Sequence, residues 1–258
     1  MAKDKARTTP SGQKNIGSHC ELLYRVEAGF GVWGLSMDDI ATFPRISAEG
    51  AGAILIDVAD AVFNENSQRR IWALAAALRN LDGVRETVPG MNNLMVVFDP
   101  LRLPPARLEQ QALAAWSSAD AAEVPSRLIE VPVIYGGAGG VDLADVAGAK
   151  GLSMQALVER HARPVYTVAA VGAMPGFVYL SGLDPALGLA RRAVPRMNVP
   201  VGSVIIGGAQ AGIMPLTAPS GWHILGVTDF PLFDPHRMPP AAFRAGDRIR
   251  FVVREVKA

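Results

Sequence analysis

The sequence predicts an α+β protein with two domains, a small α/β unit followed by a domain built mostly of strands. Up to about residue 122, apolar residues at helical spacing alternate with short apolar runs. After residue 164, nearly every apolar run is short and bounded by glycine or proline, which is typical of a β-barrel or sandwich. We therefore expect a flexible tail at 1–19, an α/β domain at 20–124 and a β domain at 125–258.

The composition narrows the class of partners. Half of the residues are hydrophobic, 19% are charged and the formal net charge is +1. The overall charge is therefore too small to attract nucleic acid or an anionic membrane. Cys20 is the one cysteine, which excludes an internal disulfide and suits a reducing compartment. The N-terminal residues lack the apolar core of a secretory signal, and no apolar run reaches about 18 residues. We expect a cytoplasmic protein without a nucleic-acid or membrane partner.

The first half contains signals for strands and two helices. Residues 64–83 carry apolar side chains at helical spacing, with asparagine or serine to cap the start and Gly83 to end the helix. Residues 104–120 form a second helical pattern, with prolines in its first turn. The remaining patterns predict a strand pair over 19–36, a buried strand over 50–59, and paired strands over 84–90 and 93–100.

The second half begins with a strand over 127–137 that ends in glycines. Two short helices are expected over 139–151 and 152–162, the second capped by Ser153. From Pro164 onward the pattern is strand and turn, with predicted strands over 164–172, 176–182, 202–208, 211–216, 221–228 and 247–256.

Familiar nucleotide and metal motifs are missing from the sequence. In "YGGAGGVDL" (135–143), Asp142 stands where a dinucleotide fingerprint needs its third glycine, and the chain contains no Gly-Lys-Ser/Thr. The four histidines and Cys20 lack metal-ligand spacing. We expect no metal site and no ATP-binding motif in this chain.

Several separated segments occur in a family's order. They include "EVPVIYGGAGGVDLADVA", "GAMPGFVYLSGLDPAL", "GAQAGIMPLTAPSGWHILGVT" and "AGDRIRFVV". In these the chain resembles the KipI / allophanate hydrolase subunit 1 family, whose bacterial members include the B subunit of 5-oxoprolinase. The resemblance runs from about Val88 to the end. It implies a small α/β N-terminal domain and a cyclophilin-like β-barrel C-terminal domain.

The resemblance also implies a function. It suggests the B subunit of a heteromeric, ATP-dependent amidohydrolase that opens the lactam of 5-oxoproline. The implied partners are a third, A subunit together with a homologous C subunit, with ATP used by the complex. Two alternatives from the same family are a KipI-like inhibitor of a histidine kinase and the carboxyltransferase subunit of a biotin-dependent, urea carboxylase-like enzyme, which would need a separate biotin carrier.

The chain departs from the family pattern at several polar or aromatic positions. Relatives have phenylalanine, threonine, tyrosine and arginine where this chain has Ala173, Ala211, Met214 and Val227. Because hydrogen-bonding groups discriminate strongly between similar substrates, these departures suggest a bulkier and less polar substrate than 5-oxoproline. Ala173 is a candidate position for an opened pocket.

Two residues are candidates for catalysis. His161 ends the second short helix, where it is either a proton shuttle at the mouth of the barrel or a half-buried histidine favoured by the helix dipole. Gln210 lies among glycine-rich turns, and its amide could recognise a lactam or stabilise a turn.

The substrate-binding candidates are of three kinds. Arg191 and Arg196, with Arg192 between them, suit a carboxylate or phosphate; alternatively they lie in a solvated loop or form ion pairs with a partner subunit. Arg196 matches a Pro-Arg motif of the family that the chain resembles, so it is preferred to Arg192 as a ligand-binding residue. Tyr135 and Gly137 end a strand before a helix, where free amides could bind an anion or a tight turn could simply need glycine.

Phe177 and Trp222 could form a pocket wall, although aromatic residues are more often core. We also expect Pro175-Gly176 to bend the chain at the rim of the barrel, with Phe177 and Tyr179 pointing inward on one face of the strand that follows.

Overall fold

The computed structural model describes residues 44–59, 63–118 and 126–257. The predicted tail at 1–19 and the predicted strand pair over 19–36 lie outside the described residues. The boundary at 124 falls in the undescribed segment 119–125, so the domain division stays a prediction.

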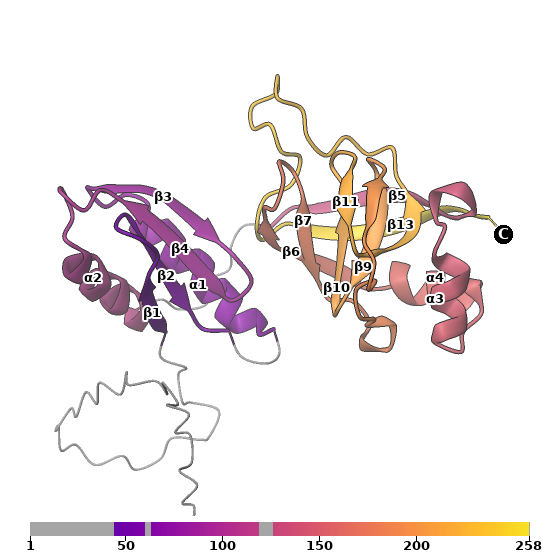
Figure 1. Ribbon diagram of the computed structural model, residues 1–258, viewed down its shortest axis with the longest axis horizontal. Coiled ribbons are helices and arrows are strands. Elements are labelled where there is room, and N and C mark those ends of the chain that lie inside the picture. The colour runs from indigo at the N-terminus through magenta and orange to yellow at the C-terminus, as the bar shows by residue number, and fades with distance from the viewer. Residues whose placement is uncertain (1–43, 60–62, 119–125, 258) are drawn as a thin grey trace, which may run out of the picture. The chain divides into compact units, whose positions relative to one another are not determined.

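The N-terminal part is a four-stranded antiparallel sheet with two helices (Figure 1). Its strands are β1 (Arg45–Ala48), β2 (Ala53–Asp57), β3 (Val84–Pro89) and β4 (Asn93–Phe98), in the order β1-β2-β4-β3. Helices α1 (Glu65–Leu78) and α2 (Pro105–Ser118) share one apolar core with β2 and β4. That core includes Ile56, Ile71, Leu94, Leu108 and Trp116.

Most predictions for this part are confirmed. Asn64 caps α1 by accepting a hydrogen bond from the Ser67 amide at 2.9 Å. The predicted end of α1 at Gly83 was wrong, because the helix stops at Leu78 and a turn follows, closed by the Leu81 amide donating to the Leu78 carbonyl at 3.1 Å. No local pattern predicts β1, which is short and largely exposed.

The C-terminal part is a closed seven-stranded barrel (Figure 1), as predicted. Its strands follow the order β10-β7-β6-β13-β5-β12-β9 around the barrel. Their bounds are β5 (Leu128–Gly136), β6 (Val165–Val171), β7 (Val178–Ser181), β9 (Ser203–Gly207), β10 (Gln210–Ile213), β12 (His223–Val227) and β13 (Arg248–Lys257). The β5–β13 pair is parallel and the other barrel pairs are antiparallel.

Strand alternation separates an inner core from an outer cluster. Val204 and Ile206 of β9 belong to the inner core, whereas Ile205 between them belongs to the outer cluster. The outer cluster also contains Val199 from a two-stranded sheet, β8 (Arg196–Val199) with β11 (Ala218–Ser220), which the sequence did not predict.

Two short helices connect β5 to β6. A single 3-10 turn, η2 (Gly137–Gly139), follows β5 and leads to α3 (Leu143–Ala149) and then α4 (Met154–Ala162). Apolar residues of both helices belong to the inner core of the barrel. Ser153 caps α4 as predicted, accepting a hydrogen bond from the Ala156 amide at 3.1 Å.

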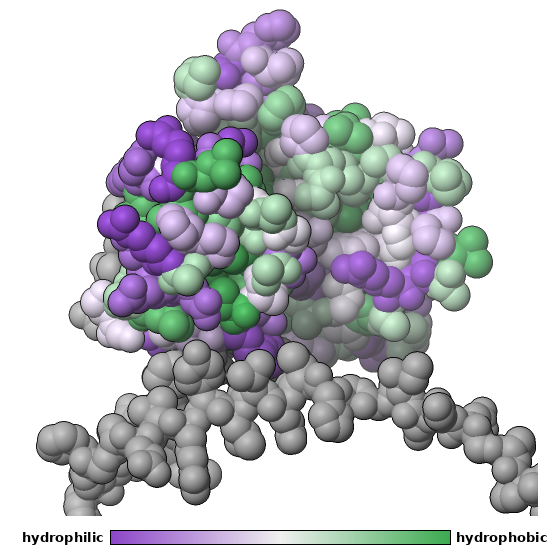
Figure 2. Space-filling model, turned by 60° about the vertical axis from the view of Figure 1, so that its left-hand side comes forward, coloured by the Kyte–Doolittle hydropathy of each residue, from purple (hydrophilic) through white to green (hydrophobic). Residues whose placement is uncertain are grey.

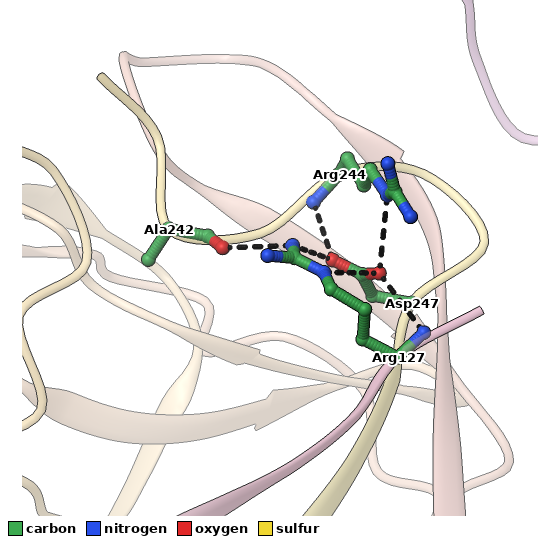
Figure 3. A network of polar contacts seen from close by, with 4 residues as sticks. All are labelled: Arg127, Ala242, Arg244 and Asp247. Carbon is green, nitrogen blue, oxygen red and sulfur yellow. Dashed lines mark hydrogen bonds and ion pairs between the residues drawn. The ribbon is translucent and has the colours of Figure 1, made fainter. Parts of the chain in front are cut away.

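A buried carboxylate joins β5 to β13 (Figure 3). Asp247 has no exposed surface and accepts from the side chain of Arg127, which binds both of its oxygens. The backbone amide of Arg244 donates to it at 2.9 Å, and the Arg127 guanidinium also reaches the carbonyl of Ala242. Burial alone would raise the pKa of Asp247, but these hydrogen bonds outweigh it and hold the pKa below its usual value. The network fixes the point where the parallel pair begins.

Hydrophilic and hydrophobic residues are interspersed on the face of the molecule shown in Figure 2. Such mixing is normal, because polar side chains cannot cover the whole surface of a folded protein. This face therefore gives no preference for one kind of partner.

Candidate functional site

A cavity of about 250 Å³ brings two of the predicted site residues together. On the barrel it is lined by Arg191, by Gln210, by Ser181 and Gly182 at the end of β7, and by the turn 207–209. Phe63 and Met91 complete the lining. The volume suits a small ligand, and the cavity combines apolar wall with a few polar groups, as ligand sites usually do.

The position of Gln210 follows from a tight hairpin. Gln210 begins β10 and lies opposite Gly207, the last residue of β9. Gly208 adopts a left-handed conformation, with φ of 63°, which glycine allows without strain. Gln210 is therefore held at the edge of the barrel, half-buried, with an amide that can both donate and accept.

Arg191 is held beside the same hairpin. Leu189 and Gly208 exchange two backbone hydrogen bonds of 3.0 and 2.7 Å. The guanidinium of Arg191 lies 5.4 Å from the ring of Trp222, within the range of a cation–π contact. An exposed guanidinium next to an amide gives the cavity one cationic group and one neutral polar group.

The structure pairs Arg196 with a buried carboxylate instead of placing it in the cavity. Its guanidinium binds both oxygens of Asp142, each at 2.6 Å, and Arg192 reaches the same carboxylate at 3.3 Å. The amide of Ile224 donates to Asp142 at 2.8 Å. Burial would raise the pKa of Asp142, but these bonds outweigh it and lower the pKa. The sequence-based preference for Arg196 was wrong about its surroundings, because a buried carboxylate already occupies its two-pronged fork.

Sequence reasoning missed Asp142. The residue stands at the N-cap position of α3, a common place for aspartate, yet its side chain makes no capping bond. Both oxygens instead bind groups from β8, β12 and the loop before β8. The acidic residue before an apolar helix was the only signal, and its partners are far away in the chain, with separations of 50, 54 and 82 residues.

His161 lies inside the barrel and not at its mouth. It has no exposed surface, its ring stacks on Phe251 with centroids 4.8 Å apart, and its Nδ1 is 2.8 Å from the hydroxyl of Tyr135. Burial lowers the pKa of His161 to about 3 and raises that of Tyr135 far above its usual value. The predicted half-buried histidine was therefore wrong. A neutral, enclosed imidazole cannot exchange protons with a ligand in the cavity.

The glycines after β5 serve close packing. Gly136 has φ of 72°, and a Cβ there would lie 2.1 Å from the carbonyl oxygen of Lys257. Gly137 has φ of 56° and abuts the Lys257 side chain. These contacts favour the tight-turn interpretation of Tyr135 and Gly137 over an anion site.

Phe177 and Trp222 belong to the outer cluster. Their rings are 6.0 Å apart and edge-on, with Tyr179 next to both. Phe177 and Tyr179 share one face as predicted, but the prediction that this face points inward was wrong, because Val178 and Leu180 take the inner positions of β7. A Cβ on Gly207 would come within 2.7 Å of the Trp222 ring, so the indole covers the barrel wall below the hairpin.

The segment 172–177 is the turn that joins β6 to β7. The Gly172 amide donates to the Phe177 carbonyl at 3.1 Å, and Ala173 has a left-handed φ of 67°. The cavity meets the other end of β7, at Ser181 and Gly182. Ala173 therefore lies about a strand's length away, near 13 Å at about 3.3 Å per residue, and does not open this cavity.

A second hollow of about 390 Å³ lies in the N-terminal part, between the end of α1 and strands β3 and β4. Its lining contains arginines that are paired with acids. Arg85 binds Asp99 at 3.0 Å and Arg102 binds Asp82 at 2.8 Å. None of the predicted site residues lines this hollow, so the barrel cavity is the better candidate.

Residues 44–257, apart from the two undescribed gaps, hold no group of three or more His, Cys, Asp or Glu side chains that could bind a metal ion. None of the helices in the described residues has the length and apolar character needed to cross a membrane.

Comparison with known proteins identifies the family. Residues 44–243 match the model of the carboxyltransferase domain, subdomains C and D. The chain is 48% identical over 193 residues to the B subunit of 5-oxoprolinase from Escherichia coli O157:H7, covering 72% of this chain and 85% of that protein. It is 41% identical over 190 residues to the B subunit of the Haemophilus influenzae enzyme, covering 74% and 89%, and 32% identical over 222 residues to that of Bacillus subtilis, covering 81% and 92%.

Solved structures agree. TTHA0988 is 37% identical, with a TM-score of 0.69 over 80% of this chain, and the chain spans 40% of that longer protein. The Kluyveromyces lactis urea amidolyase shares the fold, with a TM-score of 0.70 over 81% of this chain at 17% identity, and the chain spans 15% of it. The chain therefore belongs to the carboxyltransferase domain family of subdomains C and D, in the group that contains the B subunits of 5-oxoprolinases.

Proposed function

We propose that this chain is the B subunit of a heteromeric, ATP-dependent 5-oxoprolinase, which opens a five-membered lactam by hydrolysis. The observation that carries the proposal is the 48% identity to a protein named as the B subunit of 5-oxoprolinase, over 85% of its length. The partners would be a third, A subunit together with a homologous C subunit. Since this sequence has no ATP motif, the phosphoryl chemistry would belong to those partners.

The barrel cavity supplies a binding site that suits this substrate. 5-Oxoproline carries a carboxylate and a cyclic amide on one small ring. The guanidinium of Arg191 would hold the carboxylate, because guanidinium–carboxylate bonds are among the stronger ones in proteins. The amide of Gln210 would pair with the lactam, which presents one donor and one acceptor.

The positions that depart from the family pattern do not line the cavity. Ala211 is buried in the inner core and Met214 in the outer cluster, and Ala173 lies in the β6–β7 turn. Val227 packs against the backbone at Gly139, where an added Cβ would come within 2.6 Å of it. We therefore propose 5-oxoproline itself as the substrate, in place of the bulkier compound that the departures suggested.

The complex co-purified with its partner subunits provides the direct test. Addition of 5-oxoproline should start the consumption of ATP and the release of glutamate, measured in parallel. ATP consumption that is independent of 5-oxoproline, with no glutamate formed, would contradict the proposal.

Replacement of Arg191 by methionine should raise the KM for 5-oxoproline by about 10- to 100-fold, since a hydrogen-bonded charge pair contributes about 1.5–3 kcal/mol. The kcat should change little, because the carboxylate lies outside the bond that breaks. The matched control is Arg250→Met, at an exposed residue of β13. The lactam 2-pyrrolidinone, which lacks the carboxylate, should react equally with both variants. An unchanged KM for 5-oxoproline would remove Arg191 from the site.

The carboxyltransferase name of the family model favours one alternative, transfer of a carboxyl group between biotin and a small amide. That reaction needs a carboxylated biotin carrier. Its test is carboxyl exchange from carboxybiotin in the presence of urea, a reaction that a 5-oxoprolinase should not catalyse.

A further inference from the structure

Three arginines lie within six residues before and in β8, but they differ in what they bind. Arg192 and Arg196 both bind the buried carboxylate of Asp142, which is 1% exposed. Within the described residues, Arg191 contacts the ring of Trp222 and forms no ion pair. The carboxylate of Asp142 therefore pairs with two of the arginines, which have a structural role, and leaves Arg191 available to a ligand.

The backbone of this segment is fixed from both sides. Before Arg191, the carbonyl of Ala190 is 2.9 Å from Nε2 of His223. After it, the amide of Arg192 donates to the carbonyl of Gly221 at 2.7 Å. Both anchoring residues flank Trp222, so the same short stretch places the indole and the guanidinium that lies over it.

Asp142 is tied into the same region through its backbone. Its amide donates to the carbonyl of Ile224 at 3.0 Å, and its carboxylate accepts from the amide of Ile224 at 2.8 Å. These two bonds hold the carboxylate rigidly against β12, so it cannot follow a shift of the segment that carries the three arginines. We propose that Asp142 is a positioning residue, which fixes segment 189–196 so that Arg191 faces the cavity; this inference rests on the proposed function.

Loss of the Asp142 charge would act on Arg191 in two ways. Arg192 and Arg196, each about a third exposed, would lose their partner, and mutual repulsion would loosen the segment. Both would also become free to bind the substrate carboxylate in a wrong position. Either effect weakens the binding of a carboxylate-bearing lactam and spares a neutral one.

The test uses the full chain in complex with its partner subunits. Asp142→Asn should raise the KM for 5-oxoproline about 10-fold while kcat and the KM for 2-pyrrolidinone stay within about twofold. Glu159→Gln, which also removes one negative charge, at an exposed position of the neighbouring helix α4, is the control and should leave the KM for both substrates unchanged. Asp142→Glu, which keeps the charge, should recover part of the loss.

Arg196→Lys provides a second variant that keeps the charge and loses the two-pronged fork. It should raise the KM for 5-oxoproline by a smaller factor than Asp142→Asn does. This measurement tests the proposal even if Asp142→Asn does not fold. The positioning role would be overturned if the KM rose equally for 5-oxoproline and 2-pyrrolidinone. It would also be overturned if Asp142→Asn and Arg196→Lys left the KM for 5-oxoproline unchanged while Arg191→Met raised it. Either result would leave the proposed function intact. A wild-type complex without lactam turnover would overturn the proposed function and this inference together.

Discussion

Asp247→Asn is expected to lower the free energy of unfolding by about 3 kcal/mol, because the buried carboxylate accepts several hydrogen bonds that an asparagine side chain cannot all replace. The carboxylate of Asp247 is enclosed by donors only, from the side chain of Arg127 and the backbone amide of Arg244 (Figure 3). An asparagine amide group would have to direct its own N–H groups at one of these donors.

Urea denaturation of the purified chain measures this loss as a lower midpoint at unchanged slope. The matched control is Asp229→Asn at the exposed pair of Asp229 with Arg254, which lies 2.9 Å apart and should cause a much smaller change because water screens it. Similar midpoints for the two variants would show that the network in Figure 3 does not hold the barrel closed.

Acid should destabilise the chain well before its carboxylates are protonated. His161 has a pKa of about 3 in the folded barrel because burial disfavours its charge, against about 6.5 in an unfolded chain. Below pH 6.5 the unfolded chain therefore binds a proton that the folded chain does not. Stability falls as the pH drops from 6.5 toward 3, by about 2 kcal/mol between pH 6.5 and 4.5.

His161→Gln is the control for this prediction. Glutamine can still bond to the hydroxyl of Tyr135 but does not titrate. The aromatic neighbours Tyr166 and Phe251 carry no charge in this range. The urea midpoint should fall between pH 6.5 and pH 4.5 in both proteins. The fall should be smaller in His161→Gln than in the wild type, by the amount that the titration of His161 contributes. An identical pH dependence in both proteins would mean that His161 is accessible to protons.

Local patterns were reliable wherever the structure depends on near neighbours. The cap at Asn64 and the cap at Ser153 involve residues three positions apart, and the barrel strands show the expected alternation. The end of α1 was harder to place, since Leu81 continues the apolar spacing of the helix although it lies in the following turn. Strands β8 and β11 depend on pairing with each other, which short-range patterns do not reveal.

The candidate site was only partly predictable. Gln210 and Arg191 were chosen for their chemistry, and the structure brings both to one cavity. His161 had equally suitable chemistry, but enclosure among Tyr135, Tyr166 and Phe251 removes its proton chemistry. The sequence shows which group a residue carries, and burial then decides whether that group can act.

By itself, the sequence determined the fold class, the family and the types of residue that could bind a small amide, because periodicity, turn residues and ordered motifs are local properties of the chain. The tertiary structure alone decided how the arginines divide. The carboxylate of Asp142 binds Arg192 and Arg196, which lie 50 and 54 residues further along the chain. Local sequence patterns do not reveal a contact between residues so far apart. Folding brings the buried charge of Asp142 to Arg192 and Arg196, and because these two arginines are then paired, Arg191 remains for the ligand.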